Sequence, residues 1–284
     1  MSHMLIFGLG YSAARIAARL RAMGWRISAV RRTGSAGIIG FDDRAAIAAA
    51  LADATHILSS APPDDDGDPV LAGFGPAIAA APAGWIGYLS STGVYGDTGG
   101  AWVDESAEVG GGRRSARAAA DLAWQALGDH VRVFRLPGIY GPGRSALDRI
   151  RAGRTHRIAL PGQVFSRVHV DDIAGGVIAA LHGPAGVYNL ADDHPAPQNA
   201  VIDYGCGLLG VAPPPLSAPA LAGLSPAALA FYAENRRISN RKAKRLLGWA
   251  PAYPDYRAGL RALNATTSPA SASAQPSAAS HDQI

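Results

Sequence analysis

The sequence predicts an α/β protein that has a doubly wound parallel sheet and a small C-terminal lobe. Short apolar runs such as "MLIFG", "WRISAV" and "ATHILSS" alternate with alanine-rich stretches of helical periodicity, which is typical of βαβ units. The chain has 284 residues, of which 48% are hydrophobic, enough for one such domain with an appended lobe. A glycine motif between the first strand and the first helix supports the same fold class.

The elements alternate in order along the first half. The first helix should follow residue 10, because Ala13, Ile16, Ala17 and Leu20 lie on one helical face. Strands are expected at 4–8, 25–30, 54–60, 84–91 and 130–141, and further helices at 44–54, 69–81 and 113–128. We therefore expect a dinucleotide-binding domain over 1–140, a mixed segment with the substrate lobe and returning sheet elements over 141–264, and a disordered Ser/Ala/Pro-rich tail over 265–284.

Composition narrows the class of protein. No run of eighteen uncharged apolar residues is present, so we expect a soluble protein with no membrane partner. The single cysteine, Cys206, excludes an internal disulfide and fits a cytoplasmic location, and no Cys/His cluster has the spacing of a metal site. The net charge is +4, but the arginines are scattered, and the dense run "NRRISNRKAKR" is interpreted as a solvated helix face. We expect no nucleic-acid partner.

The segment "GLGYSA" predicts a dinucleotide site of the Rossmann type. Gly8 permits a tight turn, Gly10 lets the backbone approach a pyrophosphate, and Ala13 allows close packing of helix on strand. Tyr11 and Ser12 lie between them at the helix N-terminus. The alternative is a tight turn that binds no ligand. The predicted cofactor-binding residues are Gly8, Gly10, Tyr11, Ser12, Ala13, Arg31, Arg32, Ser60 and Ala61.

The second strand ends in two arginines rather than in an acidic residue. An acidic side chain at this place holds the ribose hydroxyls of NAD, whereas Arg31 and Arg32 offer positive N–H donors to a 2′-phosphate. The sequence therefore predicts NADP as the cofactor, with NAD as the second choice. The alternative is that both arginines only face water.

Several motifs together resemble the extended short-chain dehydrogenases/reductases, close to the NAD-dependent epimerase/dehydratase group. They are the glycine motif, "SSTGVYGD", "RLPGIYGPGRS", "SRVHVDDIAGGVIAAL", "YNLADD" and the closing "NRRISNRKAKRLLGWAPAYPDYRAGL", in family order up to about residue 264. The resemblance implies that Ser91, with its neighbour Thr92, helps to bind the reacting oxygen. The alternative is that "SST" is only a polar strand end.

The family also expects Tyr-x-x-x-Lys on the next helix, and this pair is missing. Aligning the family's acidic residue with Asp121 places Arg113 and Arg117 at the tyrosine and lysine positions. A guanidinium stays charged and cannot exchange a proton at neutral pH. Two arginines at i, i+4 suit a bound anion, so both are predicted to bind substrate; an exposed helix face without function is the alternative.

If catalysis persists, another group must handle the proton. Tyr140 is taken as the catalytic candidate, and His169 as a substrate-binding residue, with a structural histidine as the alternative. Tyr95 and the acids Asp104 and Glu105 are further candidates, although both tyrosines also suit structural roles.

These observations predict an NADP-binding oxidoreductase of the epimerase/dehydratase type that acts on a small or sugar-nucleotide-like substrate. A non-catalytic NADP-binding redox sensor or scaffold is the alternative. The resemblance also allows a homodimer through the helices at 69–81 and 113–128, as extended members often form.

Overall fold

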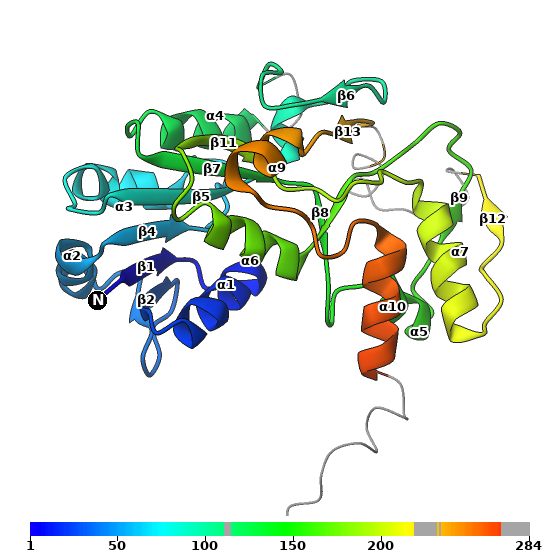
Figure 1. The fold of residues 1–284 in the computed structure, drawn as a ribbon, viewed down its shortest axis with the longest axis horizontal. Helices are drawn as coiled ribbons and strands as arrows, with labels where there is room; N and C mark the ends of the chain where they lie inside the picture. The colour runs from blue at the N-terminus through cyan, green and yellow to red at the C-terminus, as the bar shows by residue number, and fades with distance from the viewer. Residues whose placement is uncertain (111–114, 219–231, 233, 268–284) are drawn as a thin grey trace, which may run out of the picture.

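The structure, a computed structural model, describes residues 1–110, 115–218, 232 and 234–267. Seven strands of this part form one sheet in the order β11-β7-β5-β4-β1-β2-β3, and all neighbouring strands are parallel. The chain winds outward from β1 in both directions (Figure 1), so the predicted doubly wound parallel sheet is confirmed. Parallel strands place their carboxyl ends at one edge, and the crevice between β1 and β4 is where this topology favours a ligand.

The strands of the sheet lie close to the predicted runs. Their bounds are β1 (His3–Phe7), β2 (Arg26–Arg31), β3 (Ile39–Gly40), β4 (His56–Ser59), β5 (Trp85–Ser91), β7 (Val131–Leu136) and β11 (Gly186–Asn189). The run at 130–141 is not one strand, because Pro137 separates β7 from β8 (Gly138–Tyr140) and cannot donate a ladder hydrogen bond. β11 follows the lobe segment and returns to the main sheet beside β7.

Helices cover both faces of the sheet (Figure 1), and each face has its own core. The helix bounds are α1 (Tyr11–Ala22), α2 (Arg44–Asp53), α3 (Pro69–Ala79), α4 (Ser115–Gln125), α6 (Val170–Ala179) and α9 (Arg241–Leu247). Met4 and Ile6 of β1 point to the face of α1 and α6, whereas Leu5 and Phe7 point to that of α2, α3 and α4. α9 packs on the α1 and α6 side through Ala243.

The lobe lies beyond the carboxyl edge of the sheet (Figure 1) and has a separate core. Its helices are α5 (Ala146–Arg151), α7 (Gln198–Leu209) and α10 (Tyr256–Thr267), joined through residues such as Leu147, Val201 and Leu260. Three parallel strand pairs complete the described part: β8 with β10 (Arg167–His169), β9 (Arg157–Ile158) with β12 (Leu216–Ser217), and β6 (Trp102–Val103) with β13 (Arg237–Ile238).

The second half of the chain differs from expectation at the basic run and at the last helix. The dense basic run is not one helix face, because β13 occupies its first half and only Arg241–Leu247 is helical. The last helix extends to Thr267, two residues beyond 265, and the rest of the predicted disordered tail lies outside the described residues. Among the described helices, none combines the length and the apolar character that a bilayer crossing requires.

Candidate active site

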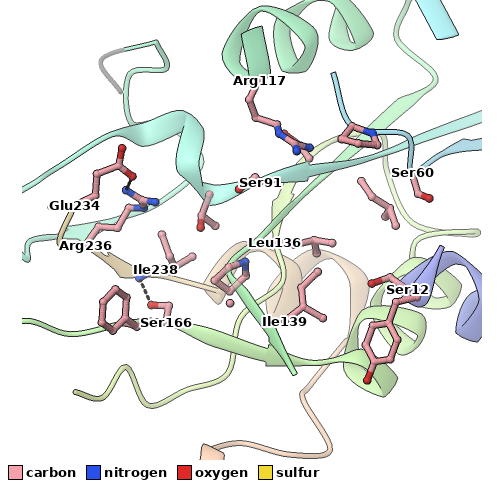
Figure 2. Close-up of a pocket in the computed structure, with 18 of the residues that line it drawn as sticks. Ser12, Ser60, Ser91, Arg117, Leu136, Ile139, Ser166, Glu234, Arg236 and Ile238 are labelled. Carbon is pink, nitrogen blue, oxygen red and sulfur yellow. Dashed lines mark hydrogen bonds and ion pairs between the residues drawn. The ribbon is translucent and has the colours of Figure 1, made fainter. Parts of the chain in front are cut away.

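A cavity of about 540 Å³ opens at the carboxyl edge of the sheet. We call it the sheet-edge cavity. Figure 2 shows it extending from the start of α1, past the end of β5, to the lobe and the segment before β13. Its lining brings together these predicted residues: Gly10, Tyr11, Ser12, Ser60, Ser91, Thr92 and Arg117. Residues from four distant parts of the sequence thus share one space, at the place where a parallel sheet favours ligand binding.

The glycine loop holds the ends of three strands close together. Gly8 has a φ of +84°, and a Cβ there would lie 2.9 Å from the Ala61 backbone nitrogen, so only glycine fits without rearrangement. Its N–H donates to the Val30 carbonyl oxygen at 2.9 Å, and the Ser60 hydroxyl donates to the Gly8 carbonyl oxygen. The loop between β1 and α1 is therefore fixed against β2 and β4.

The N-terminus of α1 is open to a ligand. Gly10 is the N-cap and supplies no side-chain acceptor to the first-turn amides, and a Cβ on it would meet no atom within 4 Å. Ala13 is fully buried, as its role in helix packing requires. The Tyr11 hydroxyl donates to the Pro142 carbonyl oxygen at 3.0 Å and so ties the helix start to the lobe. Uncapped amides next to open space fit the pyrophosphate of a dinucleotide.

Arg31 and Arg32 lie at the carboxyl end of β2, directly after the Val30 carbonyl that Gly8 binds. Both residues are exposed, and neither lines the sheet-edge cavity. They are therefore placed outside the cavity but on the β2 side of the glycine loop, where the adenosine end of a dinucleotide lies in this topology.

Ser91 ends β5 with its side chain at the cavity. Its Oγ accepts a hydrogen bond from the Gly93 N–H at 3.1 Å, so the hydroxyl proton is available for an external acceptor. Thr92 follows at the start of the short 3₁₀ turn Thr92–Tyr95 and is 4% exposed. The strand end thus presents one oriented hydroxyl donor at the centre of the cavity.

Arg117 extends from α4 toward the cavity, as Figure 2 shows. The guanidinium lies near the phenol of Tyr88, whose pKa is raised above its usual value mainly by burial, while Arg117 acts in the opposite direction. Behind it, the Ser90 hydroxyl donates to Asp121 at 2.5 Å and links α4 to β5. Arg113, its predicted companion, lies outside the described residues.

The structure does not bring Tyr140 or His169 to this cavity. The Tyr140 hydroxyl donates to the Asp255 carbonyl oxygen at 3.4 Å, and burial raises its pKa far above the usual value. His169 is 1% exposed, and its Nδ1 accepts from the Asp171 N–H at 3.2 Å, so it caps α6. Both residues thus lie outside the sheet-edge cavity, as the structural alternative expects. Tyr140 lines a neighbouring cavity in the lobe, and His169 Nε2 is buried without a hydrogen-bond partner in the described part. Their roles in catalysis and substrate binding stay predictions.

The other proton candidates also lie elsewhere. The Tyr95 hydroxyl donates to Asn189 Oδ1 at 2.8 Å and accepts from Arg135 at 3.0 Å, which is a buried structural role. Asp104 and Glu105 line a different cavity beside α9. None of the three contributes a group to the sheet-edge cavity.

Sequence reasoning missed the lobe side of the cavity. Arg236 and Glu234 form an ion pair there at 2.8 Å, and Arg236 also donates to the Gly96 carbonyl oxygen. Ser166, which precedes β10, lies at the same end (Figure 2), and its neighbour Phe165 also lines the cavity. The motifs that contain these residues were recognised, but no local pattern indicates that 165–166 and 234–236 meet across the cavity.

The chain is similar to a solved structure from Silicibacter pomeroyi, described as a functionally unknown conserved protein. It is 42% identical, has a TM-score of 0.83, and the match covers 93% of this chain and 99% of that one. The chain belongs to the same family as that Silicibacter protein. No protein-family model matches the chain.

Two further similarities concern the fold and part of the chain. Human epimerase family protein SDR39U1, solved with NADPH, is 20% identical with a TM-score of 0.74 over 93% of this chain and 99% of its own. The fold is thus that of epimerase/dehydratase-type proteins, which agrees with the resemblance at the level of the fold. A Streptomyces protein named 3-diazoavenalumate denitrifying reductase is 35% identical over 140 residues. This match covers 45% of the present chain and 45% of the Streptomyces protein, so the chain spans about half the length of that relative.

Proposed function

We propose that this chain is an NADP(H)-dependent oxidoreductase that transfers hydride to or from a small substrate in the sheet-edge cavity. One observation carries the proposal: the open, uncapped N-terminus of α1 and the Ser91 hydroxyl line the same cavity. The neighbour solved with NADPH supports the choice of cofactor, as do Arg31 and Arg32 at the end of β2. When bound, the nicotinamide would supply or accept the hydride.

The residues of the chain would orient the substrate. Ser91 donates its free hydroxyl proton to the reacting oxygen, and the turn that begins at Thr92 positions this hydroxyl through the Gly93 N–H. Arg117 supplies a permanent positive charge from α4, which stabilises negative charge that develops in a cavity partly shielded from water. Because a guanidinium does not release its proton, Arg117 acts by charge and not as a general acid.

The described cavity lining favours reductions that need no proton from a side chain. Its single carboxylate in the described part is Glu234, which is paired with Arg236. A hydride acceptor that already carries positive charge, such as an iminium or diazonium group, needs no such donor. Replacement of a diazonium group by hydride forms a carbon–hydrogen bond and releases dinitrogen. The name of the Streptomyces relative, a reductase of a diazo compound, agrees with this class.

The same lining supports a second function, that of a redox sensor or scaffold that binds NADP without turnover. The observation in its favour is that Tyr11, the phenol in the described lining, already donates its hydroxyl proton to the Pro142 carbonyl oxygen. A sugar-nucleotide substrate and a homodimer through α3 and α4 also remain predictions. Leu122 on α4 is 52% exposed, and an apolar side chain on that surface agrees with the homodimer.

The deciding experiment combines binding and turnover. Calorimetric titration with NADPH, NADH and their oxidised forms should show tight binding of NADPH first. NADPH oxidation is then followed with aldehydes, ketones, a cyclic iminium and an aryl diazonium salt. Ser91→Ala should abolish most of the rate with a carbonyl acceptor and change the rate with the diazonium salt little, because that acceptor has no oxygen to bind.

The control is Ser217→Ala in β12, which should leave both rates unchanged. Tight NADPH binding without oxidation by any acceptor would support the sensor. No binding of any nicotinamide nucleotide at millimolar concentration would contradict both functions.

A further inference from the structure

A second cavity adjoins the sheet-edge cavity on its lobe side. We call it the lobe cavity; its volume is about 650 Å³, within the range of small-molecule sites. The two cavities share a wall, formed by Gly138, Ile139, Arg144, Phe165 and Ser166. A ligand whose reacting atom lies near Ser91 could therefore extend past this wall into the lobe.

Positive side chains dominate the lobe cavity. Four arginines line it: Arg144, Arg149, Arg154 and Arg167. The one carboxylate in the described lining, Asp148, is engaged in the capping box of α5, where it accepts from the Ser145 N–H at 2.8 Å and from its hydroxyl at 2.6 Å. The cavity therefore carries an excess of positive charge that its own lining does not balance.

The innermost of these cations is Arg167, which is only 7% exposed. Its guanidinium donates to the carbonyl oxygens of Phe165 and Ala196, at 2.8 and 2.9 Å, and to the Gln198 amide oxygen at 3.0 Å. Within the described residues, Asp192 acts on Arg167 as an opposite charge, but these hydrogen bonds all go to neutral oxygens. A buried guanidinium that is hydrogen-bonded only to neutral groups is costly, so an anion beside it would be stabilising.

The neighbouring acid, Asp192, is pushed toward its neutral form by burial. It is 2% exposed, and burial raises its pKa to about 8, although Arg167 acts to lower it. Arg149, on α5, meanwhile acts as a like charge on Arg167. Both guanidinium groups line one cavity, so an anion that binds between them would relieve their repulsion.

We propose that the lobe cavity binds an anionic group, a carboxylate or a phosphoryl group, between Arg149 and Arg167, with Arg154 at the rim. Where the anionic group is part of the substrate, the inference rests on the proposed function. The anion would then hold the substrate in the lobe while its reacting atom lies at Ser91. The aromatic pair Phe165 and Tyr232, with ring centroids 5.6 Å apart, gives the site a flat wall for an apolar or aromatic body.

The test measures anion binding directly, with inorganic phosphate and benzoate as probes in calorimetric titrations of the full chain. Arg149→Gln and Arg154→Gln remove exposed cations and should leave the fold intact. Each should weaken binding of the preferred anion about tenfold or more, the usual effect of losing a charge-assisted hydrogen bond. Tighter binding of phosphate would assign a phosphoryl ligand, and tighter binding of benzoate a carboxylate.

Two variants serve as controls. Arg21→Gln removes an exposed charge on α1 far from the lobe and should change nothing. Arg32→Gln tests the alternative that inorganic phosphate binds at the cofactor's 2′-phosphate position, and it should leave benzoate binding unchanged. If neither probe saturates at millimolar concentration, if Arg149→Gln binds like the unmodified chain, or if only Arg32→Gln loses binding, the inference is wrong. NADPH titrations of the same preparations separate its failure from that of the proposed function.

Discussion

Asp121 on α4 and Arg135 on β7 form a bidentate ion pair in the interior, with Nη2 2.7 Å from Oδ1 and Nε 3.1 Å from Oδ2. Asp121 is fully buried and Arg135 is 2% exposed. Ser90 donates to the same carboxylate, and Arg135 also reaches Tyr95. The pair therefore fixes the helix that carries Arg117 against the strands that end at the cavity.

Breaking this pair should be costly. Asp121→Asn leaves Arg135 buried without its counter-charge, and we expect a loss of about 3–5 kcal/mol in the free energy of unfolding, measured by urea denaturation. The matched control is Asp203→Asn, since Asp203 pairs with Arg157 at 2.9 Å but is 44% exposed. That change should cost at most about 1 kcal/mol. Equal losses in the two variants would contradict the structural role assigned to the buried pair.

Cofactor choice should depend on the end of β2. Arg31→Ala and Arg32→Ala remove donors for a 2′-phosphate, so each should weaken NADPH binding about tenfold and leave NADH binding nearly unchanged. The measurement is calorimetric titration with both nucleotides. Arg21→Ala, an exposed arginine on α1, is the control for a general change in charge. A parallel loss for NADH and NADPH would show that these side chains do not read the 2′-phosphate.

Asp192 gives a pH dependence of stability with a definite sign. Its folded-state pKa is raised by burial to about 8 from an ordinary value near 3.8, so the folded state holds a proton that the unfolded state releases. The contribution of Asp192 to the free energy of unfolding is complete below about pH 4 and decreases as the pH rises toward 8. Asp192→Asn, which never ionises, should gain stability over the unmodified chain across this window. A constant difference between pH 4 and 8 in urea titrations would contradict the raised pKa.

His169 should act in the opposite direction. Burial lowers its pKa to about 4, so below pH 6.5 the unfolded state binds a proton that the folded state does not bind. The contribution of His169 to the free energy of unfolding is complete above pH 6.5 and is lost as the pH falls toward 4. His169→Asn keeps a side-chain acceptor for the Asp171 N–H and removes the titration. The stability difference between the variant and the unmodified chain should therefore change between pH 6.5 and 4, and should stay flat above pH 7.

Local sequence was sufficient for most of the fold and for part of the site. Apolar runs between alanine-rich helices predicted the sheet, and "GLGYSA" predicted the open helix start, because strand and helix periods and glycine conformations are local properties. Ser91 followed from a motif at a strand end. Pro137 could have signalled the break between β7 and β8, since proline disrupts a ladder.

Contacts between distant segments were not predictable in this way. Tyr140 was chosen for its motif, yet its hydroxyl is bound to the Asp255 carbonyl, 115 residues away along the chain. Arg236 was assigned to a solvated helix face and instead lines the cavity with Glu234. No local pattern specifies which polar group finds its partner across the molecule, because that choice depends on burial in the complete fold.

By itself, the sequence determined the layered α/β architecture, the glycine loop and the lack of a Tyr-x-x-x-Lys pair, because each depends on residue type and near-neighbour spacing. Only the tertiary structure decided which hydroxyl is free at the cavity, that the phenol of Tyr140 is bound to a carbonyl, and that Arg149 and Arg167 line one cavity in the lobe. The physical reason is that protonation state and charge balance are set by desolvation and by partners that the folded chain brings together.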